Sequence, residues 1–305
     1  MVKLPENKAL RAGIFMVLAM GSFVFNDTII KVIGPSLPVG ELIAVRGFMA
    51  MLIIAAICAH QGVLQDVPKI ANRRVILRNI FDLLSTIAFV TALMHMQIAN
   101  LTAVMQAVPL AVALLSMVFL KEQVGLRRMA AIVLGFIGVL MIVKPSAATF
   151  NLYDMLALII VFCVAVRDLL TKRIPVRIPT FVVALGNAGF VTVGGAMLCA
   201  FQGVKWPEAW QFGLLALAAC CLASGYLFMV ATLRLGELSG TAPFRYSIMV
   251  FAIISGIVVF REFPDWIATL GMVLIVATGL YAAHREAKLG RADALSERSA
   301  RTPAQ

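Results

Sequence analysis

Long apolar runs recur along the chain between residue 11 and residue 284, and short segments rich in proline, glycine or charge separate them. A helix needs about 17 to 25 mostly apolar residues to cross the hydrocarbon core of a bilayer. Runs of this length cover residues 11–33, 38–59, 76–95, 100–120, 127–144, 153–174, 178–200, 211–233, 239–260 and 266–284. The pattern predicts an all-α integral membrane protein with ten transmembrane helices and no soluble domain.

The composition agrees with lipid as the main solvent of this chain. Hydrophobic residues make up 62% of the 305 positions, charged residues make up 13%, and the mean hydropathy is +0.97. The net charge of +11 would be typical of a nucleic-acid-binding protein if the cations formed one patch. Lys and Arg instead lie mostly in the short segments between apolar runs and in the C-terminal tail. We therefore expect the lipid bilayer, and no nucleic acid, as a partner.

The placement of Lys and Arg predicts the orientation in the membrane. With both termini in the cytoplasm, 19 cations lie inside and four lie outside, namely Lys31, Lys144, Lys205 and Arg261. Cations are retained on the cytoplasmic side, so the chain is expected to be N-in and C-in. No small-residue cleavage site closes the first apolar run, which we interpret as a spanning helix rather than a signal peptide.

The two halves of the chain resemble each other at an offset of about 140 residues. Asn26-Asp27-x-x-x-Lys31 matches Arg167-Asp168-x-x-x-Lys172, and the segment 120–122 matches the segment 260–262. Each half contains five predicted helices, an odd number, so the second half crosses the membrane in the opposite orientation to the first. This arrangement is a 5+5 inverted repeat. The expected units are residues 1–145, residues 152–284 and a disordered cytoplasmic tail at 285–305.

Two segments carry a recognisable pattern. The fourth helix of each half ends in Lys-Glu or Arg-Glu, and the last helix of each half contains glycine, Gly138 in one and Gly271 and Gly279 in the other. With ten helices in two halves, the chain resembles the drug/metabolite transporter superfamily, and the EamA-type repeat is the nearest description. The resemblance covers nearly the whole chain.

This resemblance implies a carrier of a small molecule in the bacterial inner membrane, driven by a gradient rather than by ATP. The sequence contains no G-x-x-x-x-G-K-[ST] segment, as such a carrier requires none. No acid–base, nucleophile or metal-ligand constellation has the usual spacing, so we expect neither an enzyme nor a metal or cofactor site. A membrane-embedded enzyme and a noncatalytic scaffold remain the competing classes.

A narrower resemblance rests on the first two helices. Phe25-Asn26-Asp27-x-x-x-Lys31 and the segment from Pro38 to Gly47, which contains Glu41 and Arg46, are similar to bacterial riboflavin-uptake members. Similar signatures occur in exporters of opine-type metallophores and in S-adenosylmethionine carriers. Riboflavin uptake is therefore the most specific expectation, and the alternative is export of an amphiphilic metabolite or S-adenosylmethionine transport. The functional unit is a monomer or a homodimer.

Ionisable side chains at membrane depth are the first candidates for a substrate or gating site, because each is costly unless it is paired or solvated. Asp27, Arg46, Arg167, Asp168 and Arg245 qualify. Asp27 and Arg46 lie at similar depth, which predicts an ion pair between them.

The second half repeats these positions with an exchange. At an offset of 141, Asn26 corresponds to Arg167 and Arg46 corresponds to Asn187, so Arg and Asn change helices. We interpret Asp27 and Asp168 as carboxylates that alternate between an arginine and a proton or substrate.

Further candidates lie on the fourth, eighth and ninth helices. Gln106 is a polar residue beside Pro109, and Arg245 and Tyr246 follow Pro243 in the corresponding helix of the second half. Arg245 suits a carboxylate or an aromatic ring, and Tyr226 and Tyr246 are able to stack on a planar solute.

A purely structural interpretation stays open for each of these groups. Asp27/Lys31, Asp168/Lys172 and Arg78/Asp82 have the spacing of ordinary i,i+4 ion pairs. Lysines and Arg245 near helix ends extend to the interface, and the tyrosines pack in the core.

Overall fold

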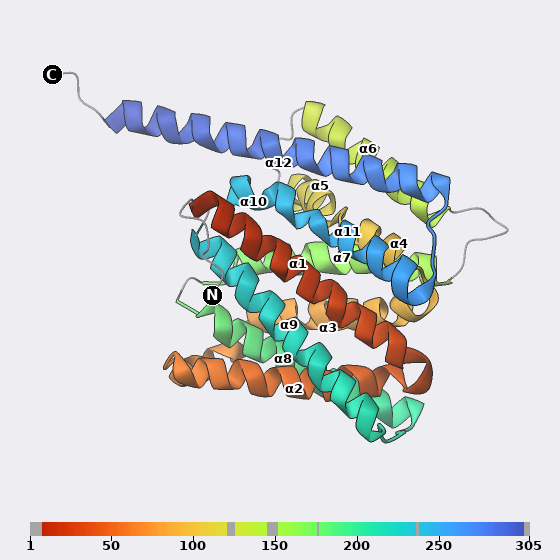
Figure 1. Ribbon diagram of the computed structural model, residues 1–305. Coiled ribbons are helices and arrows are strands. Elements are labelled where there is room, and N and C mark those ends of the chain that lie inside the picture. Colours follow the sequence, from red (N-terminus) through yellow and green to blue (C-terminus); the bar gives the residue numbers. More distant parts are fainter. Residues whose placement is uncertain (1–7, 121–125, 145–151, 176, 236–237, 302–305) are drawn as a thin grey trace.

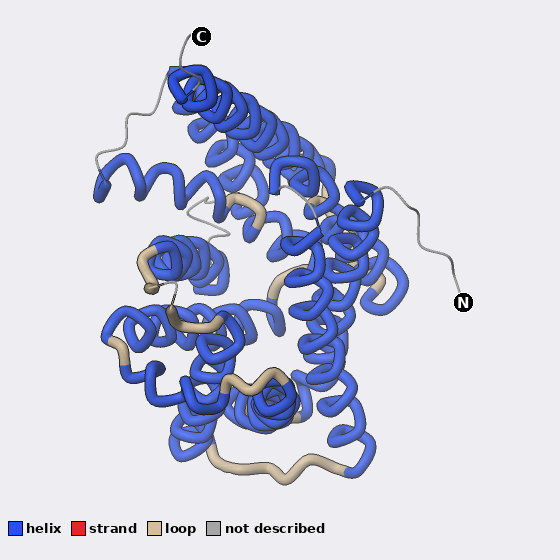
Figure 2. Tube along the Cα trace, turned by 90° about the vertical axis from the view of Figure 1, so that its left-hand side faces the viewer, coloured by secondary structure: helices blue, strands red, loops and turns tan. Residues whose placement is uncertain are grey.

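The computed structural model describes residues 8–120, 126–144, 152–175, 177–235 and 238–301. Regular structure in these ranges is helical, and they contain no strand (Figure 2). The first half contains α1 (Lys8–Ile33), η1 (Gly34–Ser36), α2 (Val39–His60), η2 (Leu64–Ala71), α3 (Arg73–His95), α4 (Ile98–Met105), α5 (Val108–Leu120) and α6 (Leu126–Val143). The second half contains α7 (Leu152–Lys172), α8 (Thr180–Gln202), α9 (Ala209–Leu235), α10 (Leu238–Arg245), α11 (Ser247–Ser255), the π-helical turn η3 (Gly256–Phe260) and α12 (Trp266–Arg301).

Seven helical segments of the described chain are long and apolar enough to cross a membrane. They are Leu10–Ser36, Val39–His60, Arg73–His95, Ile98–Phe119, Thr180–Gln202, Ala209–Thr232 and Pro243–Phe260. Two shorter apolar helices, Met129–Val143 and Trp266–Ala282, accompany them. The helix α7 has 21 residues but carries Asp154, Arg167, Asp168 and Lys172, which lowers its apolar character. The prediction of an all-helical membrane protein is confirmed.

Two predicted spans are each broken into successive helices at corresponding positions. The first break, at Gln106, separates α4 from α5, and the second, at Tyr246, separates α10 from α11. Pro109 lies just after the first break and has no N–H to donate to the carbonyl of Met105, so α4 ends there. Pro243 lies inside α10, three residues before the second break, and likewise has no backbone N–H to donate within that helix. Both breaks leave backbone carbonyls outside the regular helical hydrogen-bond pattern.

The most extensive helix contacts join the first half of the chain to the second half. Helix α1 packs along α9, α2 along α8, α3 along α7, and α6 along α12 (Figure 1). The largest apolar core lies between the halves and includes Ile33, Leu42 and Leu101 from one half with Ile160 and Leu215 from the other. Neither half therefore buries its apolar side chains alone.

The end of the chain differs from the sequence-based expectation. Helix α12 continues to Arg301 and extends past the bundle (Figure 1). The predicted disordered tail is therefore helical from residue 285 to residue 301, while residues 302–305 lie outside the described part. A helix that already has four turns inside the bundle extends without a new nucleation cost, which composition alone does not capture.

Candidate functional site

A cavity of about 230 Å³ lies between the two halves and is lined mainly by α1, α2 and α3 from one half and α7, α8 and α9 from the other. Its polar lining residues are Asn26, Asp27, Arg46, Arg78, Asp82, Ser85, Thr86, Arg167, Asn187 and Tyr226. Apolar side chains such as Phe89, Met105, Ile160 and Leu222 form the rest of the wall. A concave site with a few charged groups among apolar ones is the usual form of a small-molecule site.

The first polar group in the cavity comes from α1 and α2. Arg46 Nη1 donates to Asn26 Oδ1 at 3.2 Å, and Asn26 Nδ2 donates to Asp27 Oδ1 at 2.8 Å. The predicted direct ion pair between Arg46 and Asp27 is therefore wrong, because the Asn26 amide lies between the two charges. Arg46 is buried, and its Nε has no hydrogen-bond partner in the described chain. The Nε–H donor of this buried guanidinium is therefore left unsatisfied.

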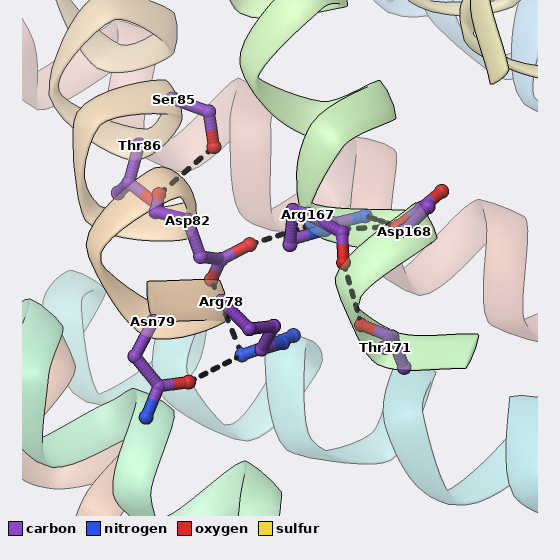
Figure 3. A network of polar contacts seen from close by, with 8 residues as sticks. All are labelled: Arg78, Asn79, Asp82, Ser85, Thr86, Arg167, Asp168 and Thr171. Carbon is purple, nitrogen blue, oxygen red and sulfur yellow. Dashed lines mark hydrogen bonds and ion pairs between the residues drawn. The ribbon is translucent and has the colours of Figure 1, made fainter. Parts of the chain in front are cut away.

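The second polar group comes from α3 and α7 (Figure 3). Arg167 Nη1 donates to Asp82 Oδ1 at 2.6 Å, while Arg167 Nε and Nη2 donate to Asp168 Oδ1 at 2.9 Å and 2.8 Å. Arg78 Nη1 lies 4.0 Å from the other oxygen of Asp82 and donates to Asn79 Oδ1 at 2.9 Å. One arginine thus bridges two carboxylates at the edge of the cavity.

Helical spacing explains why α3 contributes so many polar groups. Asp82 follows Arg78 by four residues, and Ser85 and Thr86 follow Asp82 by three and four, so these side chains lie toward one face of the helix. Ser85 and Thr86 donate to the backbone oxygen of Asp82, both at 2.8 Å, which satisfies their hydroxyl protons inside the helix. The sequence interpretation treated Asp82 as half of a helix-end pair and missed this polar face, although its period was visible.

Two other predicted i,i+4 pairs do not form among the described residues. Lys31 turns away from Asp27 and bonds Glu262 Oε1 at 2.6 Å and the backbone oxygen of Met96 at 2.6 Å. Asp168 pairs with its neighbour Arg167, and Lys172 is exposed. For Lys31 the tertiary partner is preferred, because a buried cation gains more from a short ion pair than from an i,i+4 neighbour at helical spacing.

The cavity brings together six of the ten predicted site residues. They are Asn26, Asp27, Arg46, Arg167, Asn187 and Tyr226. Asp168 joins them only through Arg167. Gln106 is buried at the break between α4 and α5, Arg245 ends α10, and Tyr246 packs against α12 at Gly279, all outside the cavity lining. The breaks at the fourth and ninth predicted spans therefore do not add their polar side chains to this cavity.

One end of the bundle, where α1 ends and α2 begins, is tightly closed. Lys31 links α1 to Glu262, and Glu262 Oε2 accepts the backbone N–H of Ile98 at 3.0 Å, at the start of α4. The ammonium group of Lys31 also lies 4.9 Å from the ring centroid of Phe260. This cluster joins both halves over the cavity.

Glycine residues allow close helix crossings at the same end. A Cβ atom at Gly195 in α8 would lie 2.6 Å from the backbone nitrogen of Ala44 in α2. A Cβ atom at Gly271 in α12 would lie 2.6 Å from the backbone oxygen of Gly138 in α6. Small residues of this kind let membrane helices approach backbone to backbone. The two halves are therefore in direct main-chain contact beside the Lys31–Glu262 cluster.

Several known proteins share this sequence pattern over most of its length. An S-adenosylmethionine uptake transporter of Rickettsia conorii is 26% identical over 90% of this chain and 92% of its own. The pseudopaline exporter CntI of Pseudomonas aeruginosa is 24% identical over 88% and 94%. A riboflavin transporter of Brucella anthropi is 24% identical over 67% and 73%.

The fold and the family assignment agree with each other. A solved crystal structure superposes with a TM-score of 0.59 at 17% identity, over 92% of this chain and 97% of that one, which establishes likeness of fold alone. The model of the EamA-like transporter family matches residues 10–144 and again residues 151–281. The chain therefore belongs to the EamA-like transporter family of the drug/metabolite transporter superfamily, and it is a multi-pass membrane protein that transports a small molecule and is not an enzyme.

Proposed function

We propose that this chain is a secondary-active transporter of the bacterial inner membrane that moves a small charged metabolite of amino-acid type by alternating access. S-adenosylmethionine is the first candidate substrate. The observation that carries the proposal is the cavity between the halves, which combines arginines with carboxylates in one small space. Ionisable side chains inside a membrane protein are costly to bury, so they are taken as functional groups by default.

The charges of the cavity favour this substrate class over riboflavin, the most specific expectation from the sequence. S-adenosylmethionine and opine-type metallophores carry carboxylate and cationic groups, which find partners in Arg46 and in the carboxylates Asp27 and Asp82. Riboflavin has no charge at neutral pH and leaves these groups without a new partner. The relatives that match almost the full chain are also named for S-adenosylmethionine and pseudopaline, whereas the riboflavin transporter matches a shorter part.

The helix packing supports a 5+5 inverted repeat with ten spanning segments. In this scheme α1 corresponds to α7 and α3 corresponds to α9, so the α1–α9 contact and the α3–α7 contact are symmetry mates. Helices α2 and α8 are mates that pack on each other, and so are α6 and α12. A two-fold relation between the halves demands this set of pairs.

Alternating access follows if the two ends of this bundle open in turn. The end held by Lys31 and Glu262 is closed, and in the predicted N-in orientation it is the outer end. The cavity reaches toward Ile54, Arg78 and Ala184 on the cytoplasmic side. The structure then corresponds to a carrier that is closed to the outside.

The deciding experiment is transport by purified protein in liposomes. Uptake of labelled S-adenosylmethionine is measured with and without an imposed pH gradient, in the presence of unlabelled riboflavin, S-adenosylhomocysteine or histidine as competitors. We expect saturable uptake that S-adenosylhomocysteine inhibits and riboflavin does not. Uptake of riboflavin instead would refute the substrate class and retain the carrier function, and no flux of any solute would refute both.

A further inference from the structure

Asp82 is a buried carboxylate in the cavity wall whose role the family resemblance does not assign. It lies in the middle of α3, and its side chain is 8% exposed. Arg167 from the other half of the protein is its hydrogen-bonded partner at 2.6 Å, and Arg78 lies 4.0 Å from its second oxygen. An ion pair of this kind costs desolvation energy and is weak evidence for stability alone. Its position among the lining residues makes it accessible to a ligand in the cavity.

The geometry of Arg167 makes the pair with Asp82 exchangeable. Only Nη1 of Arg167 binds Asp82, at 2.6 Å, whereas Nε and Nη2 both bind Asp168 Oδ1. If another cation takes Asp82, Arg167 still keeps two hydrogen bonds to a carboxylate. Breaking a buried ion pair is costly because it leaves a charge without a partner. Asp168 remains the partner of Arg167, so this cost is avoided for the arginine.

The surroundings of Asp82 favour a cation over an anion at this place. Arg78 Nη1 lies 4.0 Å from Asp82 Oδ2 and donates its hydrogen bond to Asn79 instead, and Arg167 is already shared by two carboxylates. An anionic ligand group beside Arg167 would meet the negative charges of both Asp82 and Asp168. In the same cavity lining, Asn187 Oδ1 is a buried acceptor without a hydrogen-bond partner in the described part of the chain. Two acceptors in the same cavity fit a group that carries positive charge or N–H donors.

We propose that Asp82 recognises the cationic group of the substrate and that Arg167 releases Asp82 by remaining paired with Asp168. This inference rests on the proposed function and adds a residue to it. Asp82 is then a specificity-determining residue, and Asp168 is a positioning residue that acts through Arg167. The carboxylate of the same substrate then lies toward Arg46, which lines the cavity and whose Nη1 donates only to the neutral amide of Asn26.

The test measures binding of S-adenosylmethionine to purified full-length protein by calorimetry. Asp82→Asn is expected to weaken binding about ten- to hundredfold, as expected for loss of one charge-assisted hydrogen bond. Asp82→Glu keeps the charge and should retain part of the affinity. Asp66→Asn, a carboxylate outside the cavity that pairs with Lys69, is the matched control and should bind normally. Size-exclusion profiles in detergent verify that each variant folds.

A second set of variants separates the proposal from a merely structural role. Asp168→Asn leaves Asp82 as the sole carboxylate partner of Arg167, so binding should weaken although residue 168 does not line the cavity. Adding Arg167→Gln to Asp168→Asn frees Asp82 again and should restore much of the affinity. Such a reversal requires coupling between neighbouring sites.

The outcomes distinguish this inference from the proposed function. If wild-type protein binds and transports S-adenosylmethionine but Asp82→Asn does so equally well, the role of Asp82 is refuted and the transporter proposal survives. A double variant Asp168→Asn/Arg167→Gln that binds S-adenosylmethionine no better than Asp168→Asn alone also refutes the release of Asp82 by Arg167. If wild-type protein binds none of the charged metabolites, both proposals fail together.

Discussion

Lys31 and Glu262 form an ion pair of 2.6 Å across the two halves of the protein, although 231 positions separate them in the sequence. The lysine ends α1, and the glutamate lies between the π-helical turn η3 and α12. Glu262 also accepts the first backbone N–H of α4, and Lys31 donates to the carbonyl of Met96. One pair of side chains thus ties three helix ends together over the closed end of the cavity.

Breaking this pair should destabilise the closed end. Lys31→Met leaves Glu262 without its cation, and Glu262→Gln leaves Lys31 without its carboxylate, so each single variant should lose roughly 2–4 kcal/mol of folding free energy. The double variant should lose less than the sum, because no unpaired charge remains. Thermal unfolding of the detergent-purified proteins measures all four forms. If the loss in the double variant equals the sum of the two single losses, Lys31 and Glu262 do not stabilise the protein through their interaction.

The glycine crossing between α8 and α2 should tolerate no larger side chain. Gly195→Val places atoms at about the position of the Ala44 backbone, so α2 and α8 must separate and the variant should lose more than about 2 kcal/mol. Gly213→Ala in α9 is the matched control, since no atom lies within 4 Å of a Cβ built there. The control should melt at or slightly above the wild-type temperature, because alanine is the better helix former. Equal melting temperatures for Gly195→Val and wild type would contradict the close crossing.

Asp27 is expected to couple transport to protons. Its carboxylate faces the cavity and is linked to Arg46 through Asn26, so a proton on Asp27 changes the charge that Arg46 experiences. Asp27→Asn should therefore remove the dependence of uptake on a pH gradient while the protein still folds. The reconstituted assay described above measures this, with Asp66→Asn as the control that keeps its response. An unchanged pH response in both Asp27→Asn and Asp168→Asn would exclude these carboxylates as coupling sites.

Two tyrosines that look equivalent in the sequence should behave differently. Tyr226 lines the cavity and packs edge to face on Phe23, with 5.5 Å between the ring centroids. Tyr246 packs against α12 outside the cavity. Tyr226→Ala should weaken binding of an adenosyl-containing substrate about tenfold, since stacking on an aromatic ring contributes about 1–3 kcal/mol. Tyr246→Phe should leave affinity unchanged. If Tyr246→Phe lost affinity and Tyr226→Ala did not, the substrate would bind near the helix breaks and not in this cavity.

Asp265 should contribute to stability in a pH-dependent way. Hydrogen bonds from Lys144 and from the backbone of Ala268 lower the pKa of this carboxyl below its usual range. A lowered pKa in the folded state stabilises the protein above the unfolded-state pKa, and this contribution disappears as pH falls through the folded-state value.

Asp265→Asn isolates that charge, because asparagine also caps a helix N-terminus. The variant should be less stable than wild type by less than about 1 kcal/mol at pH 7, since the ion pair is partly exposed. The difference should begin to shrink below about pH 4, where the Asp265 carboxyl of the unfolded chain takes up its proton, and should disappear only below the lowered folded-state pKa. Unfolding curves at pH 3.5 and pH 7 measure the change, and a constant difference at both values would contradict the role of the charge.

The sequence alone determined the class of this protein. Long apolar runs have one solution in lipid, the helix, because every backbone polar group must be satisfied internally. The match between Asn26-Asp27 and Arg167-Asp168 also indicated two related halves, and six of the ten predicted site residues line one cavity. These inferences depend on local pattern and on depth along a helix, which a sequence displays directly.

Only the tertiary structure decided which charges meet. Lys31 pairs with Glu262 and not with Asp27. The Asn26 amide lies between Arg46 and Asp27, and Arg167 pairs with Asp82. Each of these contacts depends on which face of a helix is turned toward another half of the protein. The helical period gives the relative positions of side chains on one helix, but the rotation of that helix is set by packing against its neighbours, and a distant ion pair of 2.6 Å leaves no local signal in the sequence.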